Sequence, residues 1–83
     1  MDSDTFFKQI SIDSLVISFK LTLISTVDGP AVFVRVLDDL QRVVFLMNSI
    51  KGEWKIKWQD DFPMWLFDFE FSLSEAINDR GGF

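Results

Sequence analysis

Apolar and polar residues alternate along most of the chain, and this period of two predicts β-strands with one buried face. Every odd position from 15 to 23 is apolar, and most of the positions between them are polar. The alternation recurs over residues 42–48, 53–59 and 65–73, while residues 31–37 form a valine-rich run. Five strands are therefore predicted, one over each of these ranges.

Short connections with turn-forming residues separate the predicted strands. Asp28 and Gly29 form a favoured hairpin dipeptide, and Asp38 with Asp39 interrupts the next apolar pattern. Pro63 bars a continued ladder between the last two predicted strands. Because short connections join strands that are neighbours in the sheet, the strands are expected to form an antiparallel meander.

The two ends of the chain carry weaker patterns. Ser72 and Glu75 stand at capping-box spacing and two glycines follow, which predicts a short helix over residues 74–79. Residues 6–10 fit a short helix, and residues 8–12 fit an extended strand nearly as well. The expected fold is a single α+β domain over residues 1–83, mainly β: a five-stranded antiparallel meander, curved or half-barrel, with the C-terminal helix and this optional N-terminal one.

The predicted turns also define a register, in which the apolar residues of all five strands fall on one face. The expected partners are Leu23 with Val34, Val34 with Val43, Met47 with Trp54, and Trp58 with Trp65. On the other face, Arg35 would lie between Thr22 and Arg42.

The apolar face is the feature on which the sequence argument depends most. Its aromatic residues, expected in the core or at a dimer contact, include Phe45, Trp54, Trp58, Trp65, Phe67 and Phe69. Short flanking helices cannot cover a five-stranded face about 20 Å across. It would be closed by curling into a barrel, by a second copy or by a different protein, and the absence of strand-interior glycines favours a homodimer.

This facing gives a test by substitution. If Trp58 lies in the core, Trp58→Ala should lower the free energy of unfolding by about 3–5 kcal/mol. Lys57, on the opposite face, should tolerate alanine at a cost under about 0.5 kcal/mol.

Composition excludes most catalytic chemistry. The chain has no cysteine and no histidine, so disulfides, thiolate sites and zinc sites of the usual kind are excluded, and no histidine is present to activate a serine. It also has no glycine-rich phosphate-binding motif. We therefore expect neither an enzyme nor a bound metal or cofactor.

Charge narrows the choice of partner. Thirteen acids against eight bases give a net charge of −5, and the bases are scattered along the chain with no two adjacent. Nucleic-acid binding is therefore disfavoured, and a protein with a basic surface fits better. The N-terminus is acidic, unlike a secretory signal, and no apolar run approaches the ~18 residues of a membrane helix. A cytoplasmic location without membrane contact is expected.

The meander would bring alternate turns to one end of the sheet. That end would carry an acidic rim made of Asp13, Asp38, Asp39, Asp60 and Asp61. Such a rim suits a basic protein surface or a divalent cation, although aspartate is also simply a common turn residue.

These observations point to a small acidic, non-catalytic protein-interaction module of the inhibitor, antitoxin or adaptor type. It would bind its partner through the acidic rim or through a sheet edge. Two alternatives stay open: a carrier of a small apolar ligand, and a structural subunit of a larger assembly.

Overall fold

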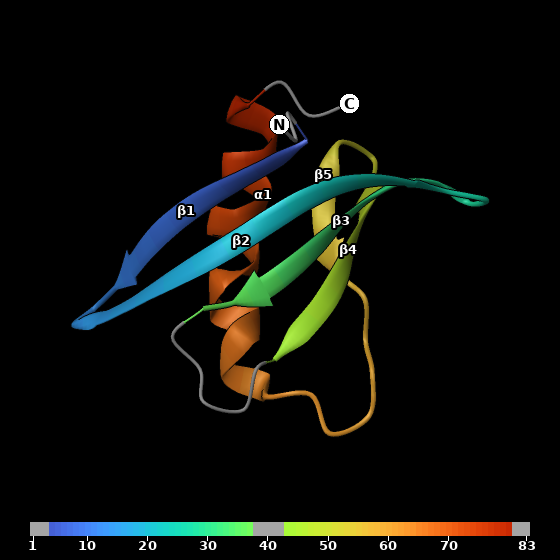
Figure 1. Ribbon diagram of the computed structural model, residues 1–83. Helices are drawn as coiled ribbons and strands as arrows, with labels where there is room; N and C mark the ends of the chain where they lie inside the picture. The colour runs from blue at the N-terminus through green and yellow to red at the C-terminus, as the bar shows by residue number, and fades with distance from the viewer. Residues whose placement is uncertain (1–3, 38–42, 81–83) are drawn as a thin grey trace.

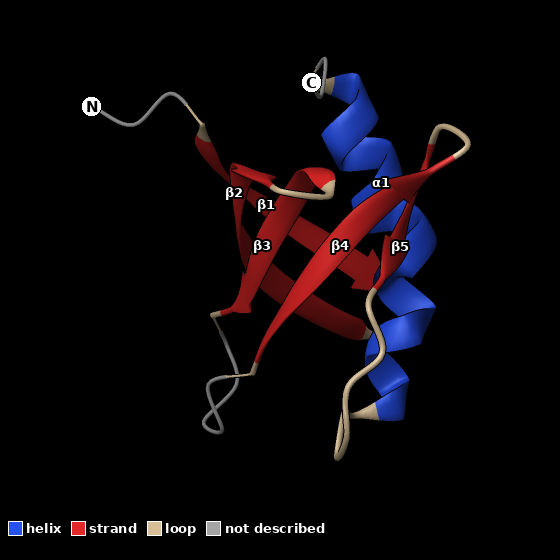
Figure 2. Cartoon of the chain, turned by 90° about the vertical axis from the view of Figure 1, so that its right-hand side faces the viewer, coloured by secondary structure: helices blue, strands red, loops and turns tan. Residues whose placement is uncertain are grey.

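Five antiparallel strands follow one another along the chain and pair in the same order, which confirms the predicted fold class (Figure 1). The computed structural model describes residues 4–37 and 43–80. The elements are β1 (Thr5–Ile12), β2 (Leu15–Thr26), β3 (Gly29–Val36), β4 (Val44–Ile50), β5 (Glu53–Ile56), the 3₁₀ helix η1 (Met64–Phe69) and α1 (Glu70–Asp79). The sheet curls into a half-barrel, and the helical segment packs against its concave side (Figure 2).

Residues 65–73 were predicted as the fifth strand, and this prediction was wrong. The segment forms η1 and the first part of α1 instead. Its apolar residues alternate, but Leu66, Phe69 and Leu73 also recur at the spacing of a helix, continued by Ile77. These four side chains are fully buried against the sheet. The helical conformation therefore buries these apolar residues and at the same time covers the sheet.

The N-terminal segment supplies the missing strand. Of the two alternatives left open by the sequence, the extended one is adopted, and β1 pairs with β2 over its whole length. Ile10 is buried on its inner side, and Phe6 packs against the core. The optional N-terminal helix is not formed.

The register differs from the predicted one by two residues in each hairpin that can be compared. Leu23 pairs with Val32, and Met47 pairs with Ile56. Similarly, Val34 pairs with Phe45. Because side chains alternate between the two faces, a shift of two residues preserves the face of every side chain. The predicted facing was therefore right for these strands although the predicted partners were wrong.

The shift arises at the turns. The chain reverses at Val27 and Asp28, one residue earlier than expected, and Gly29 follows with a φ of +114°. Between β4 and β5 the reversal uses only Lys51 and Gly52, whose φ values are +54° and +83°. A two-residue hairpin with both φ values positive matches the twist of the strands, and Gly52 adopts it without steric cost.

Lys51 offers a small stabilising substitution. A lysine in the left-handed region costs roughly 1–2 kcal/mol, whereas asparagine tolerates that region better. We expect Lys51→Asn to raise the free energy of unfolding by about 0.5–1 kcal/mol in urea titrations. Lys57→Asn, at an exposed position without positive φ, should change it by less than about 0.5 kcal/mol. Equal effects at both positions would show that the turn conformation is not the cause.

The core lies between the sheet and the helical segment. The rings of Phe19 and Phe69 meet at 5.6 Å, and those of Phe45 and Phe62 at 5.4 Å. The prediction that the flanks cannot cover the apolar face was wrong, because the covering segment runs from Met64 to Asp79 rather than over residues 74–79. A homodimer was expected because the apolar face was expected to be uncovered, and the covered face removes this reason.

Neither helical segment in the described ranges has the length and apolar character of a membrane span.

Candidate functional site

The acidic rim is only partly within the described residues. Asp13 lies in the β1–β2 turn, and Asp60 and Asp61 lie in the connection from β5 to η1, all three exposed. Figure 1 shows this turn and this connection on opposite sides of the molecule, so the sheet does not bring their carboxylates together. Asp38 and Asp39 lie outside the described residues. Among residues 4–37 and 43–80, no three carboxylates are arranged to hold a metal ion.

The aromatic residues expected on the apolar face divide into two groups. Phe45, Trp54 and Phe69 are buried, and Phe67 is half-buried. Trp58 and Trp65, by contrast, are 60% and 38% exposed.

Trp58 was expected in the core, and it lies at the surface. The reason is that β5 ends at Ile56, so Trp58 has left the sheet and stacks on the ring of Phe67, 6.2 Å away. The expected effect of Trp58→Ala therefore falls from a core-sized loss to about 1 kcal/mol or less.

One edge of the sheet is closed by side chains of α1. The backbone N–H of Trp54 donates to Ser74 Oγ at 2.9 Å, and that of Ile56 donates to Glu70 Oε2 at 2.8 Å. These are the two N–H groups of β5 that point away from β4, because Lys57 N bonds back to β4 at Leu46 O and alternate residues face alternate sides. Asn78 adds a bond from its Nδ2 to Gly52 O. The free edge of β5 is thus occupied.

Within residues 4–37 and 43–80, no side chain covers the other edge, along β1, in this way. Leu23 N donates to Asp4 O at 2.8 Å, which fixes the even positions of β1 as those bonded to β2. The backbone groups of Phe7, Gln9 and Ser11 therefore face away from the sheet. These positions are exposed, as expected for an edge without a covering strand.

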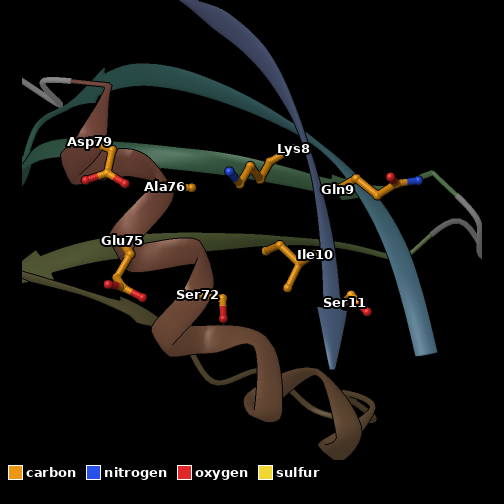
Figure 3. A pocket seen from close by; sticks show the side chains of 8 residues that line it. All are labelled: Lys8, Gln9, Ile10, Ser11, Ser72, Glu75, Ala76 and Asp79. Carbon is orange, nitrogen blue, oxygen red and sulfur yellow. The ribbon is translucent and has the colours of Figure 1, made fainter. Parts of the chain in front are cut away.

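A groove of about 270 Å³ lies between this edge and α1 (Figure 3). Lys8 and Ile10 point from β1 towards the helix, whereas Gln9 points away from it. The helical wall is formed by Ser72, Glu75, Ala76 and Asp79, and the strand wall by residues 8–11. A second, smaller pocket of about 140 Å³ lies on the other side of α1, beside the occupied β5 edge.

The sequence pattern identified a sheet edge as a candidate but assigned it to the wrong segment. The edges were expected at residues 15–23 and 65–73, and they are β1 and β5. The available signal was the spacing of Phe6, Ile10 and Ile12 at even positions, interrupted by Lys8. That interruption made the helical interpretation of the same residues equally acceptable.

The chain matches no known family model, and its comparison with curated proteins and with solved structures gives no significant match.

Proposed function

We propose that this chain is a small non-catalytic protein-interaction module that binds an extended segment of another protein as an additional strand along β1. A single observation carries the proposal: α1 occupies the outward N–H groups of β5, while the outward groups of β1 border an open groove. An exposed edge can accept a strand from a partner, and main-chain hydrogen bonds then supply affinity.

The walls of the groove suggest which segments it would favour. Glu75 and Asp79 stand four residues apart on the helical wall, so both project from one side of α1. Lys8 stands on the strand wall. Two acids against one base give this groove a formal charge of −1, which favours a segment with a basic side chain facing the helix. Ile10 and Ala76 also line the groove, and they favour a small or apolar residue next to that basic side chain in the bound segment.

The alternative of an apolar carrier has less support. A carrier would hold its ligand between the sheet and the helix, and this space is filled by the side chains of Phe19, Phe45, Phe69, Met47 and Leu66. The larger of the two pockets, by the β1 edge, has charged and hydroxyl side chains among its lining, unlike the mostly apolar pockets of small-molecule carriers.

The test separates the backbone of β1 from its side chains. Peptides are selected from a displayed random library against the wild-type protein, and the enriched sequences are synthesised and titrated by calorimetry. Gln9→Pro removes an outward N–H that β2 does not use, so the sheet should be retained and peptide affinity should fall by about tenfold or more. Gln9→Ala keeps this N–H, and its peptide affinity should stay within about twofold of wild type.

Circular dichroism of both variants checks that the fold is retained, and Ser11→Pro provides a second outward position. Enriched peptides that bind Gln9→Pro as tightly as the wild type would exclude strand addition at β1. A library that yields no binding peptide would exclude it as well.

A further inference from the structure

The outer face of the sheet, opposite the helix, has a charge very different from that of the whole chain. The register assigns to its strand positions three bases, Lys20, Arg35 and Lys55, and one acid, Glu53. Lys55 is neutralised locally, because its Nζ lies 3.4 Å from Glu53 and 3.8 Å from Glu70. Lys20 and Arg35 are direct neighbours across β2 and β3, so a basic centre is formed on a protein whose net charge is −5.

Two phenylalanines flank this basic centre. Phe7 pairs with Lys20 across β1 and β2, and it is 66% exposed. Phe33 lies two residues before Arg35 on the same face of β3, pairs with Thr22 and is 39% exposed. With strands ~4.8 Å apart and ~6.7 Å between alternate residues, the two rings start from Cα atoms about 12 Å apart. Phe7, Lys20 and Arg35 therefore lie in one row across β1, β2 and β3, and Phe33 lies in the next row on the strand of Arg35. Two exposed rings thus adjoin two cations on one face.

The arrangement differs from that of a protein-binding patch. Such patches have an apolar centre and a polar rim. Here Lys20, Thr22 and Arg35 lie on the central strands β2 and β3, whereas the exposed Val16 and Val44 lie near the starts of β2 and β4, with Val44 paired to Arg35. Aromatic rings interleaved with basic residues on one accessible face are typical of surfaces that bind single-stranded nucleic acid.

The net negative charge does not prevent such binding. Among the exposed carboxylates, those of Asp68, Glu75 and Asp79 belong to the helical segment on the far side of the sheet (Figure 2), and those of Asp13 and Asp28 lie in turns at the ends of the strands. The scattering of bases along the sequence argued against nucleic acid, but folding places two of them side by side.

We propose that the outer face of the sheet binds single-stranded nucleic acid, with bases stacked on Phe7 and Phe33 and phosphates held near Lys20 and Arg35. This site is distinct from the β1 groove, which lies on the helical side of the strand. It does not depend on the strand-binding function proposed above.

The probe is a fluorescein-labelled oligothymidine of about 20 nucleotides, longer than the site of one small domain, followed by fluorescence anisotropy. Phe7→Ala and Phe33→Ala are each expected to weaken its binding by about tenfold, the size of one lost stacking contact. Arg35→Gln should also weaken it and should reduce the slope of log affinity against log salt by about 0.7 between about 50 and 200 mM. Phe71 on α1 is 71% exposed, close to the 66% of Phe7, so Phe71→Ala is the matched control for Phe7→Ala and should bind as wild type.

Gln9→Pro should bind the oligonucleotide normally, so loss of one proposed function is distinguishable from loss of the other. No binding of oligothymidine at about 50 mM salt would overturn the nucleic-acid proposal. Binding that is unchanged in both phenylalanine variants, or displaced equally by heparin, would also overturn it, because charge alone would then explain the affinity. Binding only to phosphatidylserine vesicles would assign the face to anionic lipid instead.

Discussion

Phe69→Ala is expected to lower the free energy of unfolding by about 3–5 kcal/mol, and Phe71→Ala by less than about 0.5 kcal/mol. Phe69 is 1% exposed, and its ring lies 5.6 Å from that of Phe19 and 5.9 Å from that of Trp65. Removing it leaves a cavity at the junction of η1, α1 and the sheet. Phe71, only two residues later, is 71% exposed and buries little when the protein folds.

The pair distinguishes the two possible conformations of this segment. In a strand, residues 69 and 71 lie on the same face, so both substitutions would be similarly damaging. In a helix they are separated by about 200°, so only one faces the core. Urea unfolding followed by circular dichroism measures both, with Phe69→Leu as a milder variant should Phe69→Ala fail to fold. Similar losses for Phe69→Ala and Phe71→Ala would mean that the segment is a strand.

The facing of side chains could be predicted from the sequence because it depends only on the parity of position within a strand. Phe19, Leu21 and Val34 were all expected to face inwards, and all are fully buried. The register was harder to predict from the sequence, since a shift of two residues leaves this parity unchanged. The only information on the register lay in the turns. The sequence did not favour the observed turn at Val27 and Asp28 over the predicted one at Asp28 and Gly29.

The conformation of residues 65–73 could not be decided from their own pattern. Phe67, Phe69 and Phe71 satisfy a period of two, while Leu66, Phe69 and Leu73 satisfy a helical one. The deciding requirement was not local. A curled sheet of five strands needs a cover, and with the N-terminal segment used as β1 only the C-terminal segment can supply it.

The candidate sites were predicted less well than the fold. A sheet edge was among the candidates, but which edge has its backbone N–H groups occupied depends on the side chains of Ser74 and Glu70, and these were assigned to different predicted elements. The pairing of two bases on the outer face was not predicted, for a related reason. In the predicted register Arg35 faced Thr22 and Arg42, whereas in the structure it faces Lys20 and Val44. A two-residue shift preserves the faces of a sheet but changes the neighbours of every residue on them.

The hydrogen bonds that Trp54 and Ile56 of β5 donate to Ser74 and Glu70 give the second prediction with a large effect on stability. Ser74 is buried, and its hydroxyl accepts the N–H of Trp54 at 2.9 Å. Ser74→Ala withdraws this acceptor from a buried donor, so the free energy of unfolding should fall by about 1–3 kcal/mol. Adding Glu70→Ala, which withdraws the acceptor of Ile56 N–H, should bring the total loss to about 2–6 kcal/mol if the two contributions nearly add.

The double variant should also change the association of the protein. With both acceptors gone, β5 would present outward N–H groups beside a short strand, the kind of edge that pairs with other chains. We therefore expect concentration-dependent oligomers in sedimentation experiments, in addition to the shift in urea unfolding. Ser72→Ala is the matched control, because Ser72 is half-buried on the β1 side of the same helix and should change stability by less than about 0.5 kcal/mol. If Ser74→Ala proved as neutral as Ser72→Ala, the β5 edge would not depend on its cap, and the contrast between the two edges of the sheet would no longer support a binding site at β1.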